Sequence, residues 1–174
     1  AFYLDVLGNA KGQKEDAGMT WTLSEPTAIK RIRLTSEQEQ FPDGIKVYFA
    51  NQPDFSDQVL IGESSSVLGT VWNLYNYVTT DSIQYIRIEG QEISDPAAFA
   101  AADSSQELKL ILNDHQKIFL KMNGTWENLS WTVENPEILQ FENGTILAQE
   151  KGSTTLTAES NGASVVLSIR VVIE

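Results

Sequence analysis

The sequence predicts an all-β protein made of two β-sandwich modules, and two observations support this. Short runs of alternating apolar and polar residues recur along the chain with turn residues between them, a spacing typical of sandwiches and barrels. Asn-Gly pairs at 143–144 and 161–162 separate such runs. A two-residue type I′ hairpin turn needs positive φ at both positions, which Asn and Gly accept. Helical periodicity is almost absent, so we expect hardly any helix.

The first module is predicted to span residues 1–94. Its expected strands are 2–7, 20–23, 30–34, 45–49, 59–61, 71–78 and 85–88. Pro26 is expected to break the second of these, and Pro42-Asp43-Gly44 to form a turn, because Pro presets φ and Gly accepts a left-handed conformation. Ile45, Val47 and Phe49 alternate with polar neighbours and are expected to point into a core. Residues 71–78 are predicted to be a strand from their aromatic and β-branched content.

The second module is predicted to span residues 106–174, after a linker at 95–105. The linker sequence is rich in Pro, Ala and Ser and has no period-two alternation. The most regular stretch of the module runs from Ile138 to Val172, where Asn143-Gly144, Lys151-Gly152 and Asn161-Gly162 separate four alternating runs. In the last run Val165, Leu167, Ile169 and Val171 share one face. We therefore expect an antiparallel β module with one face in a core.

Composition excludes several classes of function. Twenty-four acidic and twelve basic residues give a formal charge of −12, which argues against nucleic acid and against an anionic membrane surface. Cysteine is absent, so disulfides and thiolate chemistry are excluded. No apolar run approaches the roughly 20 residues of a membrane helix. The chain begins at Ala-Phe-Tyr rather than Met, so we interpret it as a piece of a longer protein with neighbouring domains.

An ordered series of residues in the second module resembles a bacterial immunoglobulin-like domain of group 2. The matching positions are Trp131, Asn135-Pro136, Ile138 with Phe141, Asn143-Gly144, Ile146 to Ala148, Gly152, Thr154 to Ala158 and Val165 to Val171. The first strand pair departs from the family, because Asn113 to Gln116 replace its glycine-containing turn. The resemblance covers roughly residues 106–174 and implies a small immunoglobulin-like sandwich in a bacterial secreted or cell-surface protein.

The first module resembles, more loosely, a discoidin or galactose-binding-like jelly roll. The residues that carry this resemblance are Trp21 to Leu23, Ile29 to Leu34, Gly44 to Phe49 and Gln84 to Ile88. The family is longer at both ends, so the module is either a truncated member or a general β-sandwich. The resemblance implies a jelly-roll-like sandwich, a carbohydrate-binding role and one structural calcium ion. Oxygen-rich loops supply the candidate ligands, either Asp5 and Asn9 near the start of the chain or Asn51, Asp54 and Asp57. A solvated turn is the alternative for these three residues.

An exposed aromatic ring can pack against the apolar face of a sugar, while amides and carboxylates bind its hydroxyls. Trp72, Tyr75 and Tyr77 form the densest aromatic group and are our candidate ligand-binding residues. The alternative is that these rings belong to the core or to cross-strand pairs. The single histidine, His115, lies in a polar turn and is interpreted as a surface residue, and no catalytic residue is predicted.

These observations predict a non-catalytic fragment of a bacterial cell-surface or secreted protein, with no cofactor beyond a structural calcium ion. Its first module is expected to bind a glycan or cell-surface polysaccharide, and its second to act as an immunoglobulin-like spacer. Two alternatives stay open. Both modules are structural or adhesive parts of a surface or phage-fibre protein, or the chain is an accessory region of a large glycoside hydrolase.

Overall fold

The computed structural model describes residues 2–76, 79–102, 107–120, 129–160 and 162–173. Within these residues the regular structure is entirely β-strand, apart from the short 3₁₀ helix η1 (Leu7–Asn9), so the predicted all-β class is confirmed. The chain divides into two compact units. The first unit is Asp5–Ala100, and the second unit is Ala1–Leu4 together with Ala101–Glu174. Along the sequence, the first unit is therefore inserted into the second.

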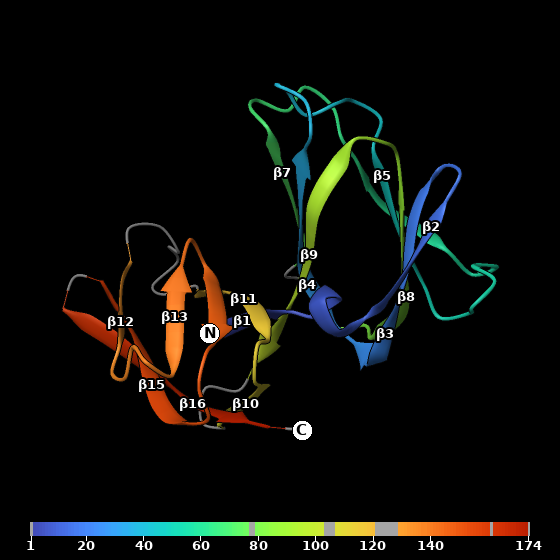
Figure 1. The fold of residues 1–174 in the computed structure, drawn as a ribbon. Helices are drawn as coiled ribbons and strands as arrows, with labels where there is room; N and C mark the ends of the chain where they lie inside the picture. The colour runs from blue at the N-terminus through green and yellow to red at the C-terminus, as the bar shows by residue number, and fades with distance from the viewer. Residues whose placement is uncertain (1, 77–78, 103–106, 121–128, 161, 174) are drawn as a thin grey trace. The chain divides into compact units, whose positions relative to one another are not determined.

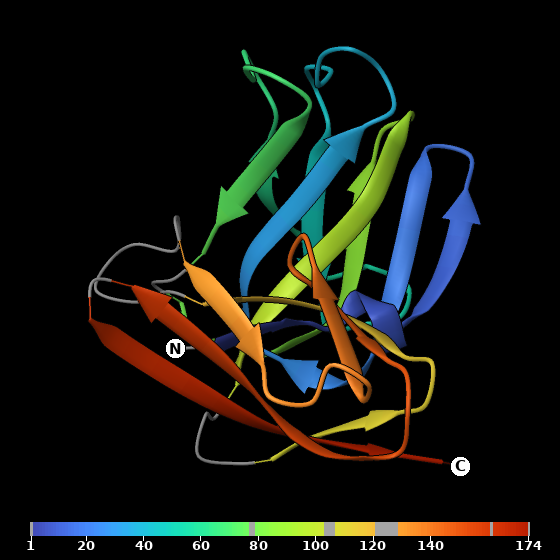
Figure 2. The ribbon, with the colours of Figure 1, turned by 60° about the vertical axis from the view of Figure 1, so that its left-hand side comes forward.

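The first unit contains two layers of strands, which face each other in Figures 1 and 2. Its strands are β2 (Lys11–Glu15), β3 (Gly18–Thr27), β4 (Ile29–Ser36), β5 (Lys46–Ala50), β6 (Val59–Glu63), β7 (Val71–Tyr75), β8 (Ile83–Glu89) and β9 (Ile93–Ala102), which continues two residues past the unit. One layer is a five-stranded sheet in the order β2-β3-β8-β5-β6. In the other, β9, β4 and β7 pair in that order.

The core of the first unit lies between these two layers. The five-stranded sheet contributes Leu23, Val47, Phe49, Ile86 and Ile88, and the opposite layer contributes Ile32, Leu34 and Ala98. Alternation along β5 is as the sequence predicts, because Val47 and Phe49 are buried with Ile45 just before them. Burial of such side chains is the main favourable term in holding two sheets together.

Pro26 does not end a strand as the sequence suggested, because β3 continues to Thr27. The register between β3 and β8 shifts between Thr22 and Thr27. A proline lacks a backbone N–H and cannot donate to a ladder, so it is tolerated where the regular pairing is interrupted. The irregularity in the ladder therefore accommodates the residue that sequence reasoning treated as a strand breaker.

The second unit also contains two groups of paired strands. They are β1 (Phe2–Asp5), whose last residue lies in the first unit, with β10 (Leu108–Ile111), β11 (His115–Leu120), β12 (Ser130–Val133), β13 (Leu139–Glu142), β14 (Thr145–Ala148), β15 (Gly152–Ser160) and β16 (Ala163–Val172). One group has the order β13-β14-β11-β1, and the other is the sheet β10-β16-β15-β12. Leu139, Ile146, Leu156 and Ile169 are fully buried in their common core.

Three details of the linker and of the second unit differ from the sequence prediction. Residues Ile93–Ala102 form strand β9, so most of the predicted linker at 95–105 is regular structure. Lys151-Gly152 does not join a hairpin, because β14 pairs with β13 and β11 whereas β15 pairs with β16 and β12. The module is not wholly antiparallel either, since β10 and β16 are parallel.

Two turn predictions have different outcomes. Asn143 and Gly144 both have positive φ, 52° and 76°, and join the paired strands β13 and β14, as an Asn-Gly hairpin requires. In the long hairpin of β15 and β16, Ser160 pairs with Ala163 and Gly162 has a φ of 82°. Asn161 itself lies outside the described residues.

Candidate functional site

The three aromatic residues predicted to bind a ligand do not share one surface. Trp72 packs against the core of the first unit, with its ring centroid 5.7 Å from that of Phe41. Successive residues of a strand point to opposite faces, so Tyr75 lies on the other face of β7, where it is 48% exposed. Tyr77 lies outside the described residues. Trp72 is therefore a packing residue, which corrects its assignment to a binding platform.

The predicted calcium ligands instead organise their own loop. Both carboxylate oxygens of Asp57 accept the backbone N–H of Asn51, at 3.1 and 3.0 Å, and Oδ1 also accepts that of Gln52. The Asp54 carboxylate accepts the backbone N–H of Ser56 at 2.9 Å. These contacts use the oxygens to stabilise turns, which is the common role of Asp in loops. In the structure the carboxylates of Asp54 and Asp57 thus bind the backbone of their own loop, and calcium binding there stays a prediction.

Asp54 stays ionised more readily than an ordinary aspartate. Hydrogen bonds from the side chain and the backbone N–H of Ser56 hold the pKa of Asp54 below its ordinary value of 3.8, because they favour the charged carboxylate. The loop that carries Asp54 also carries Phe55, which has a φ of 58° and is 8% exposed. The loop thus folds its aromatic ring back onto the unit while its carboxylate remains at the surface.

The loop and the outer face of the five-stranded sheet enclose a hollow of about 460 Å³, called here the outer hollow. Its residues come from β2, β3, β8 and the loop, and they are Gln13, Glu15, Thr20, Trp21, Thr22, Pro53, Asp54, Phe55, Tyr85 and Arg87. A volume of this size lies within the range of small-molecule sites, roughly 300–1,000 Å³. Amide, hydroxyl, carboxylate and guanidinium groups thus surround aromatic rings in one concave surface.

Strand register brings these polar groups together. Thr20 of β3 lies opposite Gln13 of β2 and opposite Arg87 of β8, so the three residues form a row across the sheet. The Thr20 hydroxyl donates to Glu15 Oε1 at 3.4 Å. Thr22 and Tyr85 are paired in the same way two residues further along. Because alternate residues of a strand share a face, this row and its neighbour form a continuous polar floor.

Aromatic contacts fix one wall of the outer hollow. The rings of Phe55 and Tyr85 meet edge to face at 6.0 Å and 66°. The Arg87 guanidinium carbon lies 4.1 Å from the Phe55 ring centroid, a cation–π contact. Arg87 Nη1 donates to Gln58 Oε1 at 2.8 Å. The wall is therefore preorganised, with a half-buried cation held against it.

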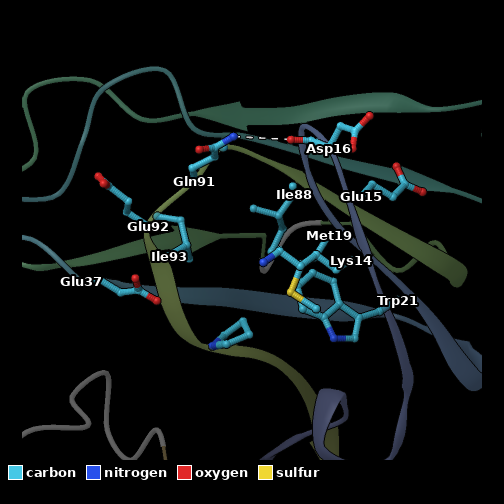
Figure 3. Close-up of a pocket in the computed structure, with 13 residues that line it drawn as sticks. Lys14, Glu15, Asp16, Met19, Trp21, Glu37, Ile88, Gln91, Glu92 and Ile93 are labelled. Carbon is cyan, nitrogen blue, oxygen red and sulfur yellow. Dashed lines mark hydrogen bonds between the residues drawn. The ribbon is translucent and has the colours of Figure 1, made fainter.

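A second hollow of about 400 Å³, called here the end hollow, lies between the β2–β3 hairpin and the start of β9 (Figure 3). Met19, Trp21, Ile88 and Ile93 supply apolar surface, while Glu37 and Glu92 lie on one side and Glu15 and Asp16 on the other. Gln91 Nε2 donates to the Asp16 carbonyl at 3.4 Å, which ties the β8–β9 loop to the hairpin. The Glu92 carboxylate accepts the Gln38 amide. The side chains of Gln91 and Glu92 thus already form hydrogen bonds that hold loops together.

The predicted surface position of His115 agrees with its exposed side chain at the start of β11. Among the residues that the structure describes, no group of three or more His, Cys, Asp or Glu side chains is placed to hold a metal ion. Across the same residues, no helix is long and apolar enough to span a membrane.

Comparison with known proteins gives no family for this chain. No protein-family model matches the sequence, and no curated protein matches it. Among solved structures, the extracellular domains 3–5 of Drosophila OTK match with a TM-score of 0.30 and 13% identity. That match covers 98% of this chain, and this chain spans 66% of the other. A TM-score of this size carries no argument about fold or function.

Sequence reasoning missed the main residues of the outer hollow. Tyr85 and Arg87 alternate with buried Ile86 and Ile88, so the period-two pattern itself places them on the outer face. Phe55 could not be found in this way, because nothing in the local sequence shows that the loop from residue 51 to residue 58 folds over this face. A search for outward-facing aromatic and charged pairs on one strand would have selected Tyr85 and Arg87.

Proposed function

We propose that this chain is a non-catalytic part of a bacterial secreted or cell-surface protein, with a saccharide-binding first unit and an immunoglobulin-like spacer as its second. The observation that carries the proposal is the outer hollow, where the Tyr85 and Phe55 rings stand beside Gln13, Glu15 and Thr22. Sugars are recognised by this combination, since a ring packs on the apolar sugar face and planar polar groups bind the hydroxyls.

The setting of the proposal rests on the sequence. Residues 106–174 resemble group 2 bacterial immunoglobulin-like domains, and the second unit is rich in strands with little irregular chain between β13 and β16. A small sandwich of this kind separates neighbouring domains without long loops, which are the mobile parts of most proteins. The same organisation fits an accessory region of a large glycoside hydrolase, whose catalytic domain would lie elsewhere in the protein.

The test is binding of the whole chain to a broad glycan array. We expect the chain to retain a defined set of saccharides and Tyr85→Ala to lose roughly two- to tenfold in affinity, because a stacked aromatic contact contributes about 0.5–1.5 kcal/mol. Gln91→Ala, in the end hollow, is the matched control and should bind like the parent chain. Thermal unfolding of each variant shows that the fold is retained.

Two results would count against this function. A folded chain that retains no saccharide leaves the structural or adhesive role as the better description of both units. If Gln91→Ala abolishes retention while Tyr85→Ala does not, the end hollow is the binding site instead. In that case the apolar surface of Met19 and Ile93, rather than the outer sheet face, would contact the ligand.

A further inference from the structure

Arg87 is the basic residue among those that line the outer hollow. Its guanidinium is held from two sides, by the Phe55 ring and by the Gln58 side-chain oxygen. Within the described part of the chain, no carboxylate lies within ion-pair distance of it. Its Nε is buried and has no hydrogen-bond acceptor among the described residues. Arg87 is thus a positioned cation with no ion-pair partner among the described residues, in a protein with twice as many acidic as basic residues.

The edge of the guanidinium that Gln58 leaves open is the one that binds carboxylates. A carboxylate accepts two parallel N–H bonds from Nε and a terminal nitrogen of arginine, and such charge-assisted pairs are about twice as strong as neutral hydrogen bonds. Arg87 lines the outer hollow, and its Nε is covered by the protein, so the side chain has to rotate before a ligand oxygen reaches that atom. An unsatisfied buried donor costs about 1–3 kcal/mol, which a bound oxygen would recover.

We propose that the outer hollow takes a carboxylate-bearing saccharide of the uronic acid class, and that Arg87 pairs with its carboxylate. This inference rests on the proposed saccharide-binding function. Tyr85 packs against the sugar ring, and Gln13 with Thr22 binds its hydroxyls from the floor of the hollow. Glu15 and Asp54, which also line the hollow, accept hydrogen bonds from the ligand hydroxyls.

The acidic residues of the hollow favour a carboxylate over a phosphate. Glu15 and Asp54 both line the hollow, and Asp54 is held in its ionised form by Ser56. A phosphate monoester carries a charge of about −1.5 to −2 near neutral pH, whereas a uronate carries a single negative charge. Repulsion from the two carboxylates therefore penalises the phosphate more. A uronic acid also carries hydroxyl groups, which can donate hydrogen bonds to Glu15 and Asp54.

The experiment compares matched ligands by isothermal titration calorimetry on the whole chain. The ligands are an oligogalacturonate, the neutral oligosaccharide with the same linkage, and inorganic phosphate as the competing anion. We expect the oligogalacturonate to bind at least tenfold more tightly than its neutral counterpart, because a hydrogen bond to a charged group contributes about 1.5–3 kcal/mol. Phosphate at millimolar concentration should not displace it.

Three variants separate recognition by Arg87 from a general effect of charge. Arg87→Gln should remove the preference for the acidic ligand, lowering its affinity roughly 10- to 100-fold. Arg87→Lys keeps the charge and the stem over Phe55 but not the fork, so it should recover only part of the affinity. Lys14→Gln removes one positive charge on β2 outside the hollow and should leave the preference unchanged.

The outcomes distinguish this inference from the proposed function. Equal binding of the acidic and neutral oligosaccharides would overturn the role of Arg87 and leave saccharide binding intact. Binding of neither, by a chain that unfolds cooperatively, would overturn both. A preference that survives in Arg87→Gln but disappears in Lys14→Gln would show that long-range charge, rather than the pairing proposed here, selects the ligand.

Discussion

Two glycines of the first unit are required for different physical reasons, and a matched pair of alanine variants separates them. A Cβ atom at Gly18 would lie 2.0 Å from the Ile88 carbonyl oxygen, in backbone that cannot move without breaking the pairing of β3 and β8. Gly69 has a φ of 87° and open space around it. We expect Gly69→Ala to cost about 1 kcal/mol of unfolding free energy, from the left-handed conformation alone.

For Gly18→Ala the cost should be about 3 kcal/mol, the upper end of what overpacking costs in a close-packed interior. Urea denaturation measures both values on chains that differ by one methyl group. Equal costs would contradict the clash and imply that the end of β3 yields easily. Because alanine is a better strand former than glycine, propensity opposes the predicted loss at Gly18 and cannot produce it.

Residue patterns predict which side chains of a regular strand are buried, but not what covers the other face. Ile45, Val47 and Phe49 could be assigned to the core because polar residues separate them. Arg31 points away from the core, as alternation predicts, yet it is only 9% exposed and binds Asn73 Oδ1 through Nε and Nη2. The partner lies 42 residues away, so no local pattern contains it.

At the scale of the element, β7 shows why an aromatic-rich strand was misread as a binding platform. Its residues have no clean alternation in sequence, because Asn73 separates Trp72 from Leu74 while Tyr75 follows directly. In the structure, Trp72 and Leu74 pack against the core and Asn73 pairs with Arg31 on the other face. The two faces could not be assigned until the partner strand β4 was known.

Alanine substitution on β7 tests this division between its faces. Trp72→Ala should lower the free energy of unfolding by about 3 kcal/mol, because a large ring packed on the core is replaced by a cavity. Tyr75→Ala, on the exposed face of the same strand, should cost roughly 1 kcal/mol. Guanidinium denaturation followed by tryptophan fluorescence for Tyr75→Ala, and by circular dichroism for both, gives the comparison. A larger loss at Tyr75 would reverse the assignment of faces.

The residues of a turn also do not reveal which strands the turn connects. Asn143-Gly144 could be predicted as a hairpin because both positions require positive φ. Lys151-Gly152 looks similar in sequence, but the chain crosses there between two groups of strands, and a Cβ atom on Gly152 would lie 2.8 Å from Ile138 Cδ1. The glycine is needed for close packing as well as for its φ of 149°. Whether a turn joins paired strands depends on pairing that local sequence does not encode.

The whole molecule is organised by an insertion that a linear division of the sequence misses. Residues at the start of the chain belong to the second unit, because Phe2, Tyr3 and Leu4 pair with Leu120, Phe119 and Ile118. The sequence predicts a strand at residues 2–7, but its partner is more than a hundred residues away and no local pattern identifies it. The ranges 1–94 and 106–174 therefore followed composition, whereas the compact units follow strand pairing.

This organisation predicts that Phe2 stabilises the second unit although it lies at the opposite end of the sequence. Phe2 is fully buried, in the same core as Ile146, Leu156 and Ile169. Phe2→Ala should cost about 3 kcal/mol, from lost burial and the cavity left behind. Hydrogen exchange should then accelerate in β11 and β14, while protection in β3 and β8 stays unchanged, because exchange reports stability locally.

Phe41→Ala provides the reciprocal control, since Phe41 is buried in the core of the first unit. It should accelerate exchange in β3 and β8 and leave β11 and β14 protected. If either variant accelerates exchange uniformly along the chain, the two units unfold as one cooperative body. If Phe2→Ala accelerates exchange only in the first unit, the pairing of β1 with β11 does not stabilise the second, and the insertion would describe connectivity without energetic consequence.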